Sequence, residues 1–421
     1  MTSSTNGDGT AVNQPTSLPS LTSLRFIVAV MIFLFHSTNY VLFASQGVGE
    51  RFLGLTTMGA WAGMTFFFML SGFVLTWVAR PKLGVLTHWR RRLMRVYPNH
   101  ILMFVVTAII MVTVLDQVFD TRVALLNIFL LQAWSPDLMD RIGFNSVSWS
   151  LSAELLFYVA FPILLPLVRK IRPENLWAWL TGVLATITLV VPFAVELLPK
   201  QEVMPFLDLT PNEFWILFHF PPTRMLEFIA GMLLARIVAT GRRIPVSFGG
   251  AMALTVGAYA LGPMFPPEFR MVAVMAVPLA LLIASGAVSD LNRTRETLLS
   301  SPSMVRMGNL SYSFYLMHMQ VLVLGSYLLS TDKVPVTTAK GFVVIAAFFA
   351  IAVGLSWVMY TVVERPAMLR FGAHSRRGAA KSAPSAVPSA VPAARPAVAE
   401  PAQTAADSVS DSVSETPVGV R

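Results

Sequence analysis

Long apolar segments separated by short polar breaks run through most of the chain. Each is about as long as the roughly 20 residues that a helix needs to cross the hydrocarbon core of a bilayer. The segments cover residues 24–43, 58–78, 101–119, 149–168, 176–197, 223–239, 246–263, 271–289, 310–330 and 341–363. The pattern therefore predicts an all-α fold, a polytopic membrane helix bundle with about ten transmembrane helices.

Segment 123–134 is apolar but too short to cross the bilayer, so we expect it to be interfacial or re-entrant. With this segment left out, every basic cluster follows an even-numbered span, at residues 80–95, 169–172, 242–243, 293–306 and 365–377. Basic loops stay on the cytoplasmic side of a membrane. We therefore expect a multi-pass protein of the cell (plasma) membrane with both termini in the cytoplasm.

The two ends of the chain differ in composition from the apolar part. Residues 1–17 are rich in Ser, Thr, Gly and Asn, and residues 371–421 are rich in Ala, Pro and Ser. Such segments bury too little apolar surface to fold. We expect a disordered N-terminal lead over 1–17, a transmembrane domain over 18–370 and a disordered cytoplasmic tail over 371–421.

Composition supports the interpretation as a membrane protein and excludes several kinds of site and partner. Only 13% of the residues are charged, about half of the usual share in soluble proteins. The net charge of +9 comes from the short loops, which argues against nucleic acid as a partner. The chain has no cysteine, which excludes disulfides, thiolate metal sites and a cysteine nucleophile. We see no His and carboxylate spacing that predicts a metal site.

Arg25 and His36 lie on the first predicted span. Ionisable groups inside a membrane are costly, so each is a candidate functional residue. The two lie about 16 Å apart along a helix axis and about three turns apart, on one face. A neutral His36 imidazole could take a proton from a hydroxyl nucleophile. The alternative is a structural histidine that bonds a neighbouring helix.

Arg92 and Arg95 belong to the basic run after the second span, and their spacing places them on one helical face. Guanidinium groups bind phosphate with paired hydrogen bonds. The alternative is that the run only sets topology. His88 and His100 flank this run, and we expect both at the surface.

Glu154 follows Trp149 and Ser150 near the start of the fourth span. We expect Glu154 in the same half of the membrane as His36, where a carboxylate could orient the imidazole. The alternative is a hydrated carboxylate close to the surface.

Other polar residues are weaker candidates. Ser71 lies in a Ser-Gly pair that favours close helix packing. Tyr315 and His318 fall inside the ninth span and are candidates to line a cavity, although tyrosine is also common at membrane boundaries. Arg224 and Glu227, three residues apart on the sixth span, are expected to pair.

Together these runs resemble the integral-membrane acyltransferase-3 family over roughly residues 20–370. The matching runs, in chain order, are Arg25-x10-His36, Phe67–Phe73 (Phe-Phe-x-x-Ser-Gly-Phe), Arg92-x-x-Arg95, Trp149-Ser150-Leu151-x-x-Glu154, Gly308–His318 and Glu364-Arg365-Pro366. Any one of these runs would be weak, but the whole set in order is specific.

The resemblance implies an enzyme that transfers acetyl or a slightly longer acyl group to a hydroxyl. The acceptor would be a sugar, a cell-envelope polymer or a macrolide-type natural product. It also implies acyl-CoA, with acetyl-CoA expected, as a co-substrate and no bound cofactor. On this basis Arg25, Arg92 and Arg95 would bind the donor, His36 and Glu154 would be catalytic, and Ser71, Trp149, Ser150, Tyr315 and His318 would line the cavity.

Two other classes also fit a bundle with buried charges. A transporter or flippase would move an acyl donor or an acceptor and make no covalent product. A membrane sensor or scaffold would have lost catalysis, against which the presence of His36 and both arginines argues. We detect no inverted repeat between the halves, so the enzyme interpretation is preferred.

Overall fold

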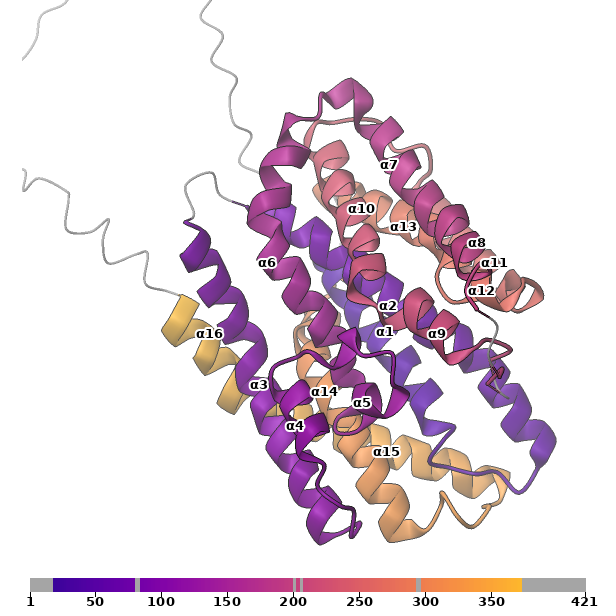
Figure 1. The fold of residues 1–421 in the computed structure, drawn as a ribbon. Helices are drawn as coiled ribbons and strands as arrows, with labels where there is room; N and C mark the ends of the chain where they lie inside the picture. The colour runs from indigo at the N-terminus through magenta and orange to yellow at the C-terminus, as the bar shows by residue number, and fades with distance from the viewer. Residues whose placement is uncertain (1–17, 80–83, 200–201, 205–206, 293–296, 373–421) are drawn as a thin grey trace, which may run out of the picture. The chain divides into compact units, whose positions relative to one another are not determined.

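The computed structural model describes residues 18–372 except 80–83, 200–201, 205–206 and 293–296, and this part is built of helices (Figure 1). The α-helices are α1 (Pro19–Ser37), α2 (Gln46–Trp77), α3 (Val85–Thr113), α4 (Thr121–Ile128), α5 (Leu138–Ile142), α6 (Trp149–Lys170), α7 (Leu176–Ala185), α8 (Val191–Val195), α9 (Pro211–Phe214), α10 (Pro221–Ala239), α11 (Phe248–Leu261), α12 (Pro267–Arg270), α13 (Ala273–Leu291), α14 (Pro302–Leu329), α15 (Thr338–Met359) and α16 (Arg365–Gly372).

Short 3-10 and π segments join these helices. The π segments are η4 (Thr186–Val190), η5 (Trp215–His219) and η8 (Tyr360–Glu364), and the 3-10 segments are η1 (Gln132–Trp134), η2 (Ser146–Ser148), η3 (Pro173–Asn175), η6 (Gly262–Met264) and η7 (Leu298–Ser300). The all-α membrane fold predicted from the sequence is confirmed. The predicted ends, 1–17 and 371–421, lie outside the described residues except for residues 371 and 372, which still belong to α16. The domain boundaries therefore stay predictions.

Every predicted span has a helical counterpart, but the structure does not confirm their number. Among the described residues, 7 helical stretches are long and apolar enough to cross a membrane. They are Pro19–Ser37, Gln46–Trp77, Val85–Thr113, Ser146–Lys170, Pro173–Val195, Pro267–Leu291 and Thr338–Arg370. The apolar helix over Phe248–Met264 is shorter, α10 carries the charged residues Arg224, Glu227 and Arg236, and α14 carries several buried polar residues. Segment 123–134 forms the short helices α4 and η1, as its length predicts.

Helices α2 and α10 pack so closely that their backbones touch. A Cβ atom at Gly72 of α2 would overlap the carbonyl oxygen of Phe228, and one at Gly231 of α10 would overlap the carbonyl oxygen of Met69. Small residues allow this approach between membrane helices, where dispersion contacts hold the bundle together. The packing role predicted for the Ser71-Gly72 pair is therefore confirmed for Gly72.

The ion pair predicted on α10 is present and completely buried. Arg224 and Glu227 lie 2.8 Å apart, and their side chains are 2% and 1% exposed. The Arg224 guanidinium also lies 5.2 Å from the centroid of the Phe68 ring and 5.5 Å from that of Phe218. Each charge is thus compensated inside the bundle, and removing one partner alone would leave the other unpaired.

Helices α1 and α14 lie side by side and run in the same direction. The segments that follow the two helices are joined by backbone hydrogen bonds. The amide of Leu42 donates to the carbonyl of Thr331 at 2.9 Å, and the amide of Val336 donates to the carbonyl of Leu42 at 2.8 Å. These bonds fix the register of the two helices at one end. The register brings a histidine on α1 next to a histidine on α14.

Candidate active site

His36 of α1 and His318 of α14 form a direct pair. His36 Nδ1 lies 2.9 Å from His318 Nε2, and the two rings are nearly parallel, with an angle of 8° between them. His318 is 0% exposed, whereas His36 keeps part of its surface accessible. His318 was predicted only to line a cavity, whereas in the structure it contacts His36, the predicted catalytic histidine.

The hydrogen bonds around this pair define which nitrogens carry protons when both rings are neutral. His318 Nδ1 lies 3.2 Å from the carbonyl oxygen of Phe314, which only accepts, so Nδ1 is the donor. His318 Nε2 is then an acceptor and receives a hydrogen bond from the Nδ1–H of His36. The remaining nitrogen, His36 Nε2, has a free lone pair. This is the arrangement of a general base whose tautomer is held by a third group.

Three arginines meet at one cavity, about 150 Å³ in volume, which we call the guanidinium cavity. Its lining includes Arg25 from α1, Arg92 and Arg95 from α3, Glu154 and Tyr158 from α6. Arg92 Nε is buried without a hydrogen-bond partner in the described part of the chain. The predicted donor-binding residues therefore do come together, although they lie far apart in the sequence. Ser71 also lines this cavity, as predicted.

Glu154 lies in this arginine cluster. Its Oε2 accepts a hydrogen bond of 2.9 Å from the hydroxyl of Tyr158, one helical turn along α6. Arg95, Arg25 and Arg92 are the charged groups that act on Glu154. The expected contact with His36 is replaced by the His36–His318 pair, because Glu154 meets α1 at the level of Arg25, about 16 Å along the helix from His36. A catalytic role for Glu154 stays a prediction.

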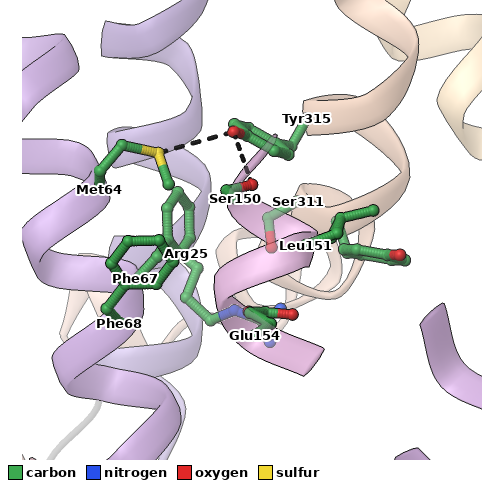
Figure 2. Close-up of a pocket in the computed structure, with 10 residues that line it drawn as sticks. Arg25, Met64, Phe67, Phe68, Ser150, Leu151, Glu154, Ser311 and Tyr315 are labelled. Atoms are coloured by element: carbon green, nitrogen blue, oxygen red, sulfur yellow. Dashed lines mark hydrogen bonds between the residues drawn. The ribbon is translucent and has the colours of Figure 1, made fainter. Parts of the chain in front are cut away.

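A second, narrower cavity continues from the first, and we call it the inner cavity. Its volume is about 60 Å³, and it shares Arg25 and Glu154 with the guanidinium cavity. Figure 2 shows these two side chains together, with Ser150 and Tyr315 farther along the same cavity. The Tyr315 hydroxyl lies 3.0 Å from that of Ser150. The Tyr315 ring centroid lies 5.9 Å from that of His318, so the Tyr315 ring stands between the inner cavity and the histidine pair, neither member of which lines that cavity.

Two predicted cavity residues, Trp149 and His318, line neither of these cavities. Trp149 packs in the bundle core, with its ring centroid 6.1 Å from that of Phe68 and 4.4 Å from that of His219. Trp149 therefore supports the start of α6, and the neighbouring Ser150 is the residue that reaches the inner cavity.

Two buried polar residues near the site, Tyr158 and Glu364, received no role from the sequence. Tyr158 lies four residues after Glu154 and so on the same helix face, a spacing that would have identified it. Glu364, at the end of the π segment η8, is buried and accepts hydrogen bonds from Ser313 at 2.6 Å and from Asn99 at 3.2 Å. π segments are frequent at functional sites, but their positions are not readable from a hydrophobic pattern.

Comparison with known proteins shows which family the chain resembles. The family model for an acyltransferase domain of the acyltransferase-3 type matches residues 18–361. Acyltransferase MdmB of Streptomyces mycarofaciens is 37% identical over 377 residues, which cover 87% of this chain and 95% of that protein. The exopolysaccharide production protein ExoZ of Rhizobium meliloti (strain 1021) is 26% identical over 286 residues, 65% of this chain and 79% of that protein.

A more distant relative matches over a shorter stretch. O-acetyltransferase OatA of Staphylococcus aureus (strain NCTC 8325 / PS 47) is 25% identical over 180 residues, 38% of this chain and 27% of that protein. No solved structure matches the chain. The match to the acyltransferase domain covers most of the membrane bundle, and MdmB matches along nearly its whole length. The chain therefore belongs to the integral-membrane acyltransferase-3 family and is a multi-pass membrane acyltransferase.

Proposed function

We propose that this enzyme moves an acetyl or short acyl group from acyl-CoA to a hydroxyl of a carbohydrate or natural product. The proposal rests on one observation. A cavity lined by three arginines lies in the same bundle as the His36–His318 pair, in which the hydrogen bonds define the tautomer of each ring. The pair supplies a base for a hydroxyl, and the cavity attracts an anionic donor.

The donor side of the proposal rests on the guanidinium cavity. Arg25, Arg92 and Arg95 outnumber the one carboxylate, Glu154, that lines it with them. Arginine binds phosphate oxygens with paired, charge-assisted hydrogen bonds, which are stronger than neutral ones. A phosphate-bearing acyl carrier such as acyl-CoA matches this excess of positive charge, and Glu154 keeps the cluster from being purely cationic when no donor is bound.

The chemical step follows from the protonation states of the pair. The acceptor hydroxyl donates to His36 Nε2 and gives up its proton as its oxygen attacks the thioester carbonyl carbon. A carbon–oxygen bond forms, the carbon–sulfur bond breaks, and the proton passes from His36 to the departing thiolate, which leaves as free CoA. His318 keeps its hydrogen bond to His36 Nδ1 throughout and stabilises the imidazolium that forms.

The acceptor side of the proposal rests on a third cavity, which we call the far cavity. Its volume is about 420 Å³, within the range of small-molecule sites. Gln320, two residues beyond His318, lines it and donates to Thr107 at 2.7 Å, while its Oε1 is buried without a partner in the described part of the chain. Tyr40 and Asp332 also line this cavity. A hydroxyl-rich acceptor fits such a lining.

The membrane orientation completes the proposal. Since the basic clusters follow even-numbered spans, both termini and the arginine side of the site would face the cytoplasm, where acyl-CoA is made. The protein would lie in the cell membrane, with the donor entering from the cytoplasm.

The test is to identify an acylated product. Membranes that contain the wild type or His36→Ala receive labelled acetyl-CoA, or propionyl-CoA and longer donors, with an extract of the host, and products are identified by mass spectrometry. We expect a labelled ester that the wild type forms and the variant does not. A donor that is bound or moved across the membrane, but never consumed in the presence of the full extract, would instead favour a transporter.

A further inference from the structure

A fourth cavity opens beside the guanidinium cavity, and we call it the mouth cavity. Its volume is about 470 Å³, and its polar lining consists of His88 and Arg92 of α3 with Arg169 and Lys170 at the end of α6. Arg169 and Lys170 are exposed, whereas His88 is 6% exposed. The cavity therefore leads from the surface into the bundle.

The mouth, guanidinium and inner cavities form one continuous series. The mouth cavity shares Leu75 and Arg92 with the guanidinium cavity, which in turn shares Phe67 and Tyr312 with the inner cavity. Their volumes fall from about 470 Å³ to about 150 Å³ and then to about 60 Å³. A ligand that fills the series must have a wide end at the surface, a narrow middle and a small end near the histidine pair.

The charge of the mouth cavity is positive throughout. Arg92, Arg169 and Lys170 line it, and no carboxylate is among the lining residues that the structure describes. Arg169 is held in place by a hydrogen bond of 3.3 Å to the carbonyl oxygen of Ala79. Three cations lining one cavity attract a group that carries several negative charges.

His88 supplies a polar atom that the protein itself leaves unpaired. Its Nε2 is buried and has no hydrogen-bond partner in the described part of the chain. Its ring stacks on that of Phe161, with centroids 5.0 Å apart and 17° between the planes. The surface position expected for His88 is therefore wrong, and so is that of His100, which is 1% exposed. A flat, aromatic wall with a free nitrogen suits a heteroaromatic ring.

We infer that the mouth cavity binds the phosphorylated nucleotide end of the acyl donor. Its terminal phosphate would contact Arg169 and Lys170, and its base would lie against His88 and Phe161. Its diphosphate would reach Arg92, where the mouth cavity meets the arginines of the guanidinium cavity. The pantetheine arm would pass through the guanidinium cavity, and the acyl group would reach the inner cavity. This inference rests on the proposed function, because it assumes that the donor is acyl-CoA.

Binding of CoA to the purified protein tests the inference without any acceptor. Titration calorimetry in detergent compares CoA, dephospho-CoA and pantetheine for the wild type and for Arg169→Ala/Lys170→Ala. We expect the wild type to bind CoA at least about tenfold more tightly than pantetheine. The double variant should lose about tenfold in CoA affinity and keep its affinity for pantetheine.

Arg172→Ala is the matched control, because Arg172 is an exposed arginine two residues after the end of α6 that does not line the mouth cavity. His88→Ala is a second variant that leaves the surface charge unchanged and should also weaken CoA selectively. Equal CoA affinity in the wild type and the double variant, or equal losses for CoA and pantetheine, would overturn the inference. If CoA binds as expected but no acylated product forms, the proposed function fails and the nucleotide site remains.

Discussion

The residue scale is where the chemistry is decided, and its central feature is the His36–His318 contact of 2.9 Å. A base is useful only if its lone pair points at the substrate, and the hydrogen bond from His318 to Phe314 sets this for His36. His318 is thus expected to act as a positioning residue, since it touches the base and not the reacting atoms.

Replacing His318 separates this role from simple packing. His318→Leu removes the acceptor for the Nδ1 proton of His36, so we expect turnover to fall by about tenfold or more, with donor affinity unchanged. His318→Gln keeps an acceptor oxygen and should retain clearly more activity. Steady-state kinetics of the two variants is the check. Equal losses in both, with reduced donor affinity, would mean that His318 only fills space.

Some of the site could be predicted from the sequence at this scale, and some could not. Arg25 and His36 stand out because charge and imidazole are rare inside an apolar span. The partner of His36 is 282 residues away, and which side chain on another helix reaches it depends on helix register. For this reason Glu154, which shares a half-span with His36 by sequence counting, was expected as the partner in place of His318.

At the scale of helices, the close contact of α2 and α10 is expected to limit the stability of the bundle. Alanine normally favours a helix over glycine by about 1 kcal/mol. At Gly72 the added Cβ would meet the carbonyl oxygen of Phe228, so the two backbones would have to separate. Overpacking of this kind costs typically about 1–3 kcal/mol, which exceeds the gain in propensity.

We therefore expect Gly72→Ala to lower the thermal unfolding midpoint in detergent, and to reduce expression in the membrane. Gly257→Ala is the control, because Gly257 lies inside α11 and a Cβ there meets nothing within 4 Å. The control should be neutral or slightly stabilising. Equal effects at both positions would show that the α2–α10 contact does not limit stability.

The helices themselves could be predicted well, because each needs a long apolar run. Their ends were less accurate. The second helix begins at Gln46, whereas the apolar pattern places its start at residue 58. The extra turns contain Gln46, Glu50 and Arg51, which an apolar pattern counts as loop although they are helical. The three π segments could not be predicted from the pattern of apolar residues, since a π turn adds one residue to a helix without changing its composition.

At the scale of the whole molecule, the arrangement of basic loops predicts which side faces the cytoplasm. The chain has no cysteine, so a single introduced cysteine reports its own position. Glu174, between α6 and α7, and Val334, between α14 and α15, are both exposed and lie on opposite predicted sides. Intact cells treated with a membrane-impermeant maleimide should label Val334→Cys, and label Glu174→Cys only after permeabilisation.

The reverse labelling pattern would invert the orientation and place the arginine side of the site outside the cell. Labelling of both positions from one side would change the number of spans between them. The wild type, which lacks cysteine, is the control for background labelling.

The series formed by the mouth, guanidinium and inner cavities also depends on the whole bundle, and it could not be predicted from the sequence. The arginines of the guanidinium cavity come from α1 and α3, the carboxylate from α6 and the tyrosine Tyr312 from α14. Each is visible as a polar residue in or near an apolar span. Their convergence depends on how the helices pack, and the packing depends on contacts such as Gly72 with Phe228 that only the folded bundle shows.

The role of His36 as the base is tested most sharply by the turnover of purified His36→Ala with acetyl-CoA and the identified acceptor, measured beside its affinity for CoA. A positioned general base contributes typically about 10²–10⁴-fold. We expect a loss of turnover in that range with CoA affinity within about twofold of the wild type. Turnover close to that of the wild type would contradict the assignment of His36 as the base, and with it the mechanism.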